Sequence, residues 1–308
     1  MSKKFLYITM VVLFILSVVL GVLIVLKQPT LKETKDLYPS YKDKIAIVEI
    51  NDEIFFASSE SLIKKDVEYY VDRLSSYFKR KDVKGIVLKI NSPGGSVAAV
   101  QRLYRQIKRL KGEYKKPIVC FVPEICASGG YYVACACDRI VCSEGSILGS
   151  VGVILQVGNI SELLKKIGVS IEVIKSSKYK DIGSFYRSMT PEERQIFESI
   201  VNTAYEQFIQ AIIDGRGLSR TQVMNFADGR VFMGPQAVDL LMADSIGDLE
   251  DAIEETKKLA GVKGEVEIIK EKVTPFDFLY NIVSEKYAKL DFWTKVEKDK
   301  FLFGYIFE

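Results

Sequence analysis

Short apolar runs rich in β-branched residues alternate along the chain with longer segments whose apolar positions recur at helical spacing. The runs 44–51, 83–91 and 117–122 are typical of buried strands. The segments 61–81 and 96–111 carry an apolar side chain every three or four residues, which is the pattern of an amphipathic helix. Strands that alternate with helices predict βα units and a largely parallel sheet, and therefore an α/β fold.

The same alternation continues less regularly towards the C-terminus. We expect further strands at 139–143, 170–174 and 265–269, and further helices at 131–137, 161–167, 190–214, 219–226, 234–241 and 249–259. The helix that starts at Thr190 is the best marked, because proline and two acidic residues follow this N-cap. We predict that it ends at Gly215 and that a polar loop, 175–188, precedes it.

An unbroken apolar run, Phe5–Leu26, occupies the N-terminus. Its length of about 22 residues matches the roughly 20 that cross a bilayer as a helix. Lys3 and Lys4 precede the run, and such flanking charges tend to stay in the cytoplasm. Because no small-x-small cleavage site closes the run, we expect a retained single-pass anchor in the cell membrane. It would comprise residues 1–27 with a cytoplasmic N-terminus, and a polar linker, 28–44, would lead to an extracytoplasmic domain.

The composition excludes several kinds of chemistry. The net charge of +3, with scattered lysines, gives no argument for nucleic acid. The 308 residues include no histidine, which excludes Ser-His-Asp and Cys-His catalysis and every His-ligated metal site. All five cysteines lie between positions 120 and 142 among apolar neighbours, at spacings that fit no zinc or redox motif. We interpret them as small buried hydrophobic residues, and we predict no metal and no cofactor.

The most informative stretch is the turn after the third predicted strand, where Ser128 is followed by Gly129 and Gly130. A serine at such a strand-to-helix turn is either an exposed nucleophile or an ordinary N-cap. Cys126, two residues earlier, is a weaker candidate nucleophile.

A second glycine-bearing turn, Ser92–Gly95, follows the preceding strand. The carboxyl ends of parallel strands share one edge of a sheet, so we expect the two turns to meet. The backbone N–H groups of Gly94, Gly95 and Gly129 are then candidates for an oxyanion hole beside Ser128.

Four motifs, in order, carry a resemblance to a known family. They are NSPGG at Asn91–Gly95, ASGGYY at Ala127–Tyr132, GSILGSVGV at Gly145–Val153 and KYKDI at Lys178–Ile182. With the apolar N-terminus, they make the chain resemble the short, single-copy form of the signal peptide peptidase A family of membrane-anchored serine proteases. The resemblance covers the anchor and about residues 45–260, and it implies a Clp-protease/crotonase-like fold. It further implies assembly into an octamer-like ring, with remnant signal peptides and other unfolded or membrane-released peptides as substrates. The departures are Asn91, where aspartate is common, Leu148 inside the glycine-rich run, and the surrounding cysteines.

The resemblance also assigns roles to residues. The nucleophile falls on Ser128, the general-base lysine on Lys180, and the serine that hydrogen-bonds this lysine on Ser150, while Gly95 matches the oxyanion glycine. An ordinary lysine is neutral in only about one molecule in a few thousand at pH 7, so such a base requires burial. Spacing alone favours a solvated loop lysine beside Asp181, and only the motif match makes Lys180 the base; Lys175 and Lys178 lie close to it in the sequence. A ring would allow neighbouring subunits to share the Ser-Lys dyad, and the sequence leaves this open.

We assign residues 45–270 to the protease domain and 271–308 to an aromatic-rich tail. The tail either packs on its own domain, packs on a neighbouring subunit, or lies at the membrane interface. The alternatives to a peptidase are a crotonase-like acyl-CoA enzyme and a non-catalytic oligomeric membrane scaffold. A sibling protease that acts on a dedicated membrane partner would differ only in its substrate.

Overall fold

The computed structural model describes residues 4–5, 10, 12–17, 42–56, 65–270 and 302–306. The chain divides into two units, 1–42 and 43–308. Within the described residues no helix has both the length and the apolar character needed to cross a bilayer. Most of the predicted anchor, linker and tail lie outside the described residues.

The second unit is built on a six-stranded sheet in which every pair of neighbouring strands is parallel, as the sequence predicts. The strand order is β10-β6-β4-β2-β1-β11. The bounds are β1 Lys44–Asn51, β2 Val83–Asn91, β4 Ile118–Val122, β6 Arg139–Cys142, β10 Ser245–Ile246 and β11 Glu267–Ile269.

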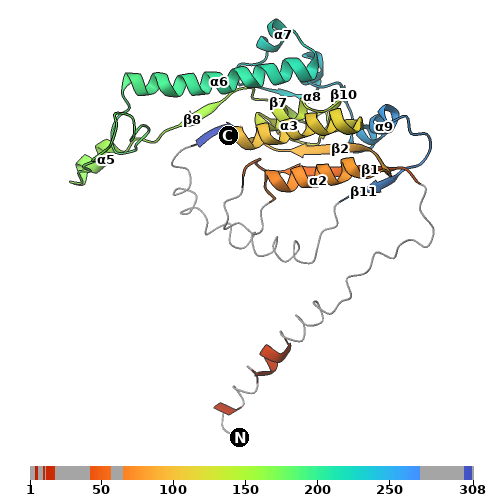
Figure 1. Ribbon diagram of the computed structural model, residues 1–308, viewed down its shortest axis with the longest axis horizontal. Helices are drawn as coiled ribbons and strands as arrows, with labels where there is room; N and C mark the ends of the chain where they lie inside the picture. The colour runs from red at the N-terminus through yellow and green to blue at the C-terminus, as the bar shows by residue number, and fades with distance from the viewer. Residues whose placement is uncertain are drawn as a thin grey trace. The chain divides into compact units, whose positions relative to one another are not determined.

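Helices cover both faces of this sheet (Figure 1). Alternate residues of each strand point to opposite faces, which divides the buried side chains into two clusters. The larger cluster faces α2 (Val67–Lys79), α3 (Val97–Tyr114) and α4 (Gly129–Ala134). The smaller one includes Ala252 of α9 (Leu249–Leu259). The fold is therefore a layered α/β structure around a parallel sheet.

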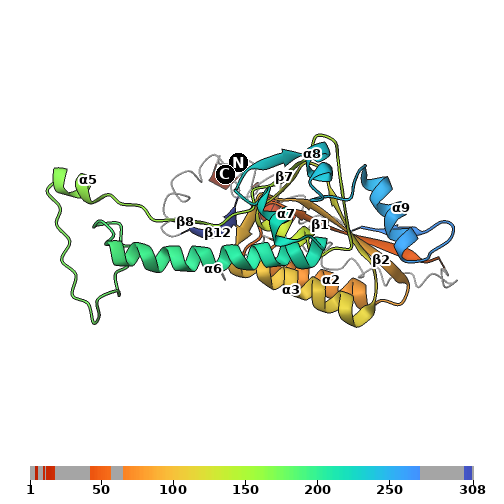
Figure 2. The same cartoon turned by 90° about the horizontal axis from the view of Figure 1, so that it is seen from above.

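Four further helices complete the unit: α5 Ser161–Lys166, α6 Pro191–Arg216, α7 Arg220–Met224 and α8 Gly234–Asp239. A capping box at Thr190 starts α6, as predicted, but the helix passes the predicted end at Gly215 and is capped by Gly217. Gly215 lies within the helix and lets it pack closely against the backbone of Cys135, since a Cβ there would lie 2.0 Å from the carbonyl oxygen of Cys135. Figure 2 shows that the N-terminal part of α6 and the segment before it extend beyond the sheet. We call this preceding segment, residues 157–190, the arm.

Short strands form two smaller sheets. In one, β12 (Leu302–Ile306) lies between β3 (Gly94–Ser96) and β8 (Ile154–Gln156). In the other, β7 (Ile147–Gly149) lies between β5 (Ile125–Ala127) and β9 (Val231–Met233). Both sheets contain residues of the predicted motifs.

Other sequence predictions also differ from the structure, and the helix expected at 61–81 is α2, which begins only at Val67. The helix expected at 131–137 begins earlier, at Gly129, directly after the candidate nucleophile. The strand expected at 170–174 is wrong, because these residues form no strand and Ile174 is 98% exposed. Their β-branched composition suits a strand, but strand propensity needs a neighbouring strand to pair with, and the chain supplies none there.

Candidate active site

Ser128 connects β5 to α4 in an unusual backbone conformation. Its φ is 50° and its ψ is −116°, which few non-glycine residues adopt. The amide of Ser128 donates to the carbonyl oxygen of Gly149 at 2.7 Å, and its own carbonyl accepts from the amide of Tyr132 at 2.9 Å. Its hydroxyl has no hydrogen bond to any described residue, so Ser128 is not a side-chain N-cap. Strained strand-to-helix turns of this kind are where nucleophilic serines are presented.

The three predicted glycines lie together beside this turn. A Cβ on Gly94, whose φ is 122°, would lie 2.8 Å from the amide nitrogen of Gly129. A Cβ on Gly129 would lie 3.1 Å from the amide nitrogen of Gly95. No side chain fits between these backbones. The amide of Gly94 donates to the Ser92 hydroxyl at 3.2 Å, so the N–H groups of Gly95 and Gly129 are the ones that suit an oxyanion hole.

The two glycine-bearing turns are held together by Asn91 and Ser92. The Asn91 side chain accepts from the amide of Ile125 at 3.1 Å and donates to a carboxylate oxygen of Glu124 at 3.3 Å. The carbonyl of Ser92 accepts from the amide of Ala127 at 3.1 Å. Asparagine at position 91 therefore still positions the site, although the sequence marked it as a departure from the family pattern.

Ser150 lies next to the nucleophile turn. It follows Gly149, the residue whose carbonyl holds the amide of Ser128. Ser150 is buried, and its φ of 49° gives this turn the same kind of backbone strain. The structure thus brings Ser128 and Ser150 close together.

Lys180 is not brought to Ser128 within one chain. It is exposed in the arm, where Gly183 approaches Phe197 of α6. The Ser128 turn lies further along the same helix, since Tyr132 of α4 donates from its hydroxyl to the carbonyl of Gln207. The ten-residue offset from 197 to 207 corresponds to about 15 Å along the helix axis.

The other two lysines of the loop have partners. The ammonium of Lys175 lies 2.6 Å from Asp181 and also donates to the carbonyl of Lys178 at 3.1 Å. The ammonium of Lys178 lies 5.0 Å from the centre of the Tyr179 ring. Within the described residues, Lys180 has no side-chain partner, which leaves its amine available.

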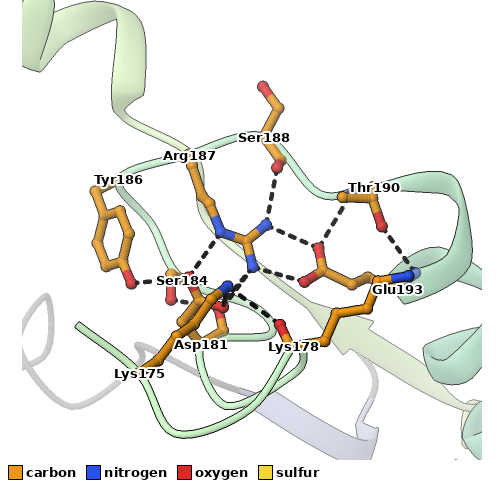
Figure 3. A network of polar contacts seen from close by, with 9 residues as sticks. All are labelled: Lys175, Lys178, Asp181, Ser184, Tyr186, Arg187, Ser188, Thr190 and Glu193. Atoms are coloured by element: carbon orange, nitrogen blue, oxygen red, sulfur yellow. Dashed lines mark hydrogen bonds and ion pairs between the residues drawn. The ribbon is translucent and has the colours of Figure 1, made fainter. Parts of the chain in front are cut away.

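A buried ion cluster anchors the loop to α6 (Figure 3). The Arg187 guanidinium lies 2.8 Å from Asp181 and 2.6 Å from Glu193, and these carboxylate side chains are only 9% and 2% exposed. It holds the pKa of Asp181 well below its usual range and lowers the pKa of Glu193 to about 2. Glu193 also accepts from the Thr190 amide in the capping box. The sequence did not lead us to predict this cluster, although Arg187 lies between Asp181 and Glu193 in the chain and could pair with both.

The cysteines are free and buried, as predicted. Cys126 is fully buried in the main core cluster. No group of histidine, cysteine or acidic side chains among the described residues has the arrangement of a metal site.

Comparison with known proteins decides the family. The sequence profile described as "Peptidase family S49" matches residues 111–263. A putative protease of Methanocaldococcus jannaschii is 36% identical over 265 residues, which cover 84% of each chain. This chain belongs to peptidase family S49. A putative signal peptide peptidase SppA of Enterococcus faecium is 32% identical over 218 residues, 70% of this chain and 63% of that protein. The resemblance to the signal peptide peptidase A family is therefore confirmed, and the S49 chain is a serine-type peptidase.

One solved structure, a 1510-N membrane-bound stomatin-specific protease in complex with a substrate peptide, is similar with a TM-score of 0.47 and 15% identity. The likeness covers 79% of this chain and 99% of that one.

Proposed function

We propose that this S49 peptidase is a serine endopeptidase in which Ser128 is the nucleophile and Lys180 the general base. The observation that carries the proposal is the position of Ser128, in a strained turn directly beside the amides of Gly95 and Gly129. A peptide carbonyl placed there meets a hydroxyl on one side and hydrogen-bond donors on the other.

The chemistry follows from these groups. A neutral lysine amine takes the proton of the Ser128 hydroxyl as its oxygen attacks the peptide carbonyl. The amides of Gly95 and Gly129 stabilise the oxyanion of the tetrahedral intermediate. The C–N bond breaks as the lysine returns the proton to the leaving amine, and water then hydrolyses the acyl-serine by the same route. A lysine base also fits a chain that contains no histidine.

We further propose that the Lys180 of each site comes from a neighbouring subunit. The arm that carries it exposes large apolar side chains, which suits burial against another copy of the chain. These are Leu163, Ile167, Ile171 and Ile174. Such burial would desolvate the base, which favours its neutral form. Assembly into an octamer-like ring would place each arm beside the Ser128 turn of the next subunit.

The location and the substrates are part of the same proposal. The apolar run Phe5–Leu26 would anchor the protein in the cell membrane, with the N-terminus cytoplasmic and the peptidase domain outside. Remnant signal peptides and other unfolded or membrane-released peptides would then reach the site by adding a strand beside it.

A subunit-mixing experiment tests the shared dyad. Ser128→Ala and Lys180→Ala proteins, each expected to be inactive alone, are co-expressed in equal amounts and assayed for peptide cleavage. If each site combines one residue from each of two subunits, random assembly restores about a quarter of wild-type activity. If both residues belong to one subunit, no activity returns. Wild-type protein that neither cleaves peptides nor labels with a fluorophosphonate would overturn the peptidase proposal itself.

A further inference from the structure

Helices α2 and α3 lie side by side and end at the same edge of the sheet (Figure 1). The Arg102 guanidinium of α3 pairs with Glu68 of α2 at 3.0 Å. One turn further along, the Gln106 side chain donates to the Ser75 hydroxyl at 2.8 Å. These contacts hold the helices parallel, and the strands that follow them, β2 and β4, are parallel neighbours. We call the edge where β1, β2 and β4 begin the amino edge; it lies opposite the edge that carries the Ser128 turn.

The amino edge is strongly basic. Residues 97–116 hold seven arginine and lysine residues and one glutamate, although the whole chain has a net charge of only +3. Five exposed cations gather towards the ends of the two helices and in the loops that follow them, and we call these five the basic patch: Lys79, Lys81, Lys108, Arg109 and Lys115. The parallel packing of α2 and α3 therefore brings together cations from two separate segments of the sequence.

The fold itself makes little use of this charge. Three aspartates at the amino edge pair with cations outside the patch, at 2.7 to 3.4 Å: Asp43 with Lys84, Asp82 with Arg80, and Asp138 with Lys111. Within the described residues, no member of the basic patch forms an ion pair. The C-terminus of a helix favours a cation such as Lys115 at the C-cap of α3, but Lys108 and Arg109 lie more than a turn before that end.

Neither helix adds an apolar surface to the patch. In the described part of the chain, none of the exposed large apolar side chains belongs to α2 or α3. A partner held here is therefore bound by charge and not by buried apolar area. Anionic lipid headgroups suit such a surface, because each lysine or arginine near them strengthens binding by about fivefold.

The start of this unit also points to a membrane as the partner. Asp43 is its first residue and lies at the amino edge, because the amide of Lys44 donates to the carbonyl of Asp82 at 2.8 Å. The proposed linker from the anchor, 28–44, therefore joins the domain next to the loop that carries Lys81. A chain of this length reaches about 60 Å at most. At such a distance a weak attraction is enough for high occupancy, because tethering raises the effective concentration.

We propose that the basic patch binds anionic lipid headgroups of the membrane that the anchor crosses, and that this contact orients the peptidase domain. The edge that carries the Ser128 turn then faces away from the bilayer. β2 runs from Val83 to Asn91 between the two edges, which places the turn about 25 Å further from the membrane than the amino edge. The site thus receives peptides after they have left the bilayer. The inference rests on the proposed anchor, but not on the proposed Ser-Lys chemistry.

Lysine footprinting tests the contact. The full-length protein is incorporated into nanodiscs of phosphatidylcholine, alone or with about one third phosphatidylglycerol, and is acetylated briefly with a succinimidyl ester. Mass spectrometry then gives the rate at each lysine. At low salt we expect Lys79, Lys81, Lys108 and Lys115 to react at least about threefold more slowly in the anionic discs. At about 0.5 M salt the difference should disappear, because the charges are screened. Equal rates in both kinds of disc at low salt overturn the inference.

Lys165 and Lys166 are internal controls for this measurement. Both are exposed on α5, in the arm, far along the chain from the amino edge. An anionic surface lowers the reactivity of every amine near it to some extent, and these two lysines report that general effect. Their rates should change much less between the discs than those of the patch. An equal change at all six lysines contradicts a specific contact.

A combined Lys108→Gln, Arg109→Gln and Lys115→Gln variant removes three charges from the patch. Lys79 and Lys81 remain as reporters, and their protection in the anionic discs should be lost, since three cations together strengthen binding about 100-fold. Persistent protection of these two lysines would show that the patch does not hold the membrane.

A second variant controls for net charge. Lys166→Gln, Arg194→Gln and Arg220→Gln together remove the same charge from exposed positions outside the patch. Protection of Lys79 and Lys81 should then stay at its wild-type level. If both variants lose it equally, overall charge and not the basic patch is responsible, and the inference is wrong.

The same discs separate this inference from the proposed function. Protected patch lysines in a protein that cleaves no peptide would overturn only the catalytic proposal. Protein that leaves the neutral discs but is captured by the anionic ones at low salt would overturn the anchor and support the patch. If soluble poly-glutamate or RNA protects the patch lysines while the anionic discs do not, the partner is a different polyanion and the lipid contact is wrong.

Discussion

The backbone amide of Ser128 donates a 2.7 Å hydrogen bond to the carbonyl oxygen of Gly149. Because Ser150 follows Gly149, this bond fixes the candidate nucleophile relative to the serine expected to orient the base. The amide of Ser150 in turn donates to the carbonyl of Arg230 at 2.8 Å. Residues of one chain therefore position both Ser128 and Ser150. The proposed base, Lys180, still has to be brought to them.

Ser128→Ala should abolish peptide hydrolysis and leave the fold intact. The hydroxyl makes no hydrogen bond within the described residues, so its removal should change the melting temperature little. We expect kcat/KM to fall at least about 1,000-fold, as for other catalytic nucleophiles. Cys126→Ala is the control and should retain activity. Near-wild-type turnover by Ser128→Ala would reassign the nucleophile.

Lys180→Ala should be nearly as damaging as Ser128→Ala, since members of one catalytic unit are not additive. Lys180→Arg should not restore activity, because a guanidinium stays protonated. Lys175→Ala and Lys178→Ala should have milder effects, because these lysines already have partners in the arm. Peptide turnover of the four variants measures this order, and an active Lys180→Ala protein would move the base elsewhere.

Activity should rise with pH through neutrality and stay high under mildly alkaline conditions, because only the neutral amine accepts a proton. The ion cluster of Arg187, Asp181 and Glu193 should not contribute to this change. Arg187 lowers the pKa of Glu193 to about 2 and keeps that of Asp181 below its usual range. Lowered carboxyl pKa values stabilise the folded state above the unfolded value of about 4, and this stabilisation is lost only as the pH falls further. Between about pH 5 and about pH 9, turnover should therefore rise, while the protection of residues 175–190 against hydrogen exchange, corrected for the intrinsic exchange rate, should stay constant. An activity optimum well below neutrality would contradict a lysine base.

Arg187→Gln should release the loop without unfolding the sheet. The substitution leaves the buried Glu193 carboxylate without an ion pair and leaves Asp181 with Lys175 alone, which disfavours the anchored conformation. We expect faster hydrogen exchange in residues 175–190 and a kcat/KM lowered at least about tenfold, since misplacing a catalytic group is costly. Arg194→Gln, an exposed position on the same helix, is the matched control. Unchanged exchange in the loop of Arg187→Gln would show that the cluster does not position Lys180.

The sequence predicts the central strands closely, because each is a run of buried β-branched residues with a glycine turn or a helix behind it. β1 and β2 have the predicted bounds, Lys44–Asn51 and Val83–Asn91. The three-residue strands β5, β7 and β9 escape prediction, since a run that short has no periodicity. The meeting of Ser128 with the three glycines was predictable for a different reason: parallel strands place their carboxyl ends at one edge.

The separation of Lys180 from Ser128 could not be read from the sequence. The residues are 52 positions apart, and the direction of the arm between them depends on how α6 packs on α4. Tyr305 is a similar case. The sequence shows an aromatic-rich tail, but only the pairing of β12 with β3 and β8 shows where one of its rings lies.

Because the five cysteines are buried, the rate at which they react with a reagent in solution measures how often the core unfolds. Burial raises the pKa of Cys135 to about 12 and that of Cys142 to about 11, and the pKa values of Cys120 and Cys137 are also well above the usual range. The thiolate is the form that attacks iodoacetamide and displaces its iodide, so the folded protein should react slowly with this reagent. All these thiols lie on or beside the central sheet, and none lies in the arm. The alkylation rate therefore measures how often the core layer unfolds, independently of any movement of the segment that carries the base.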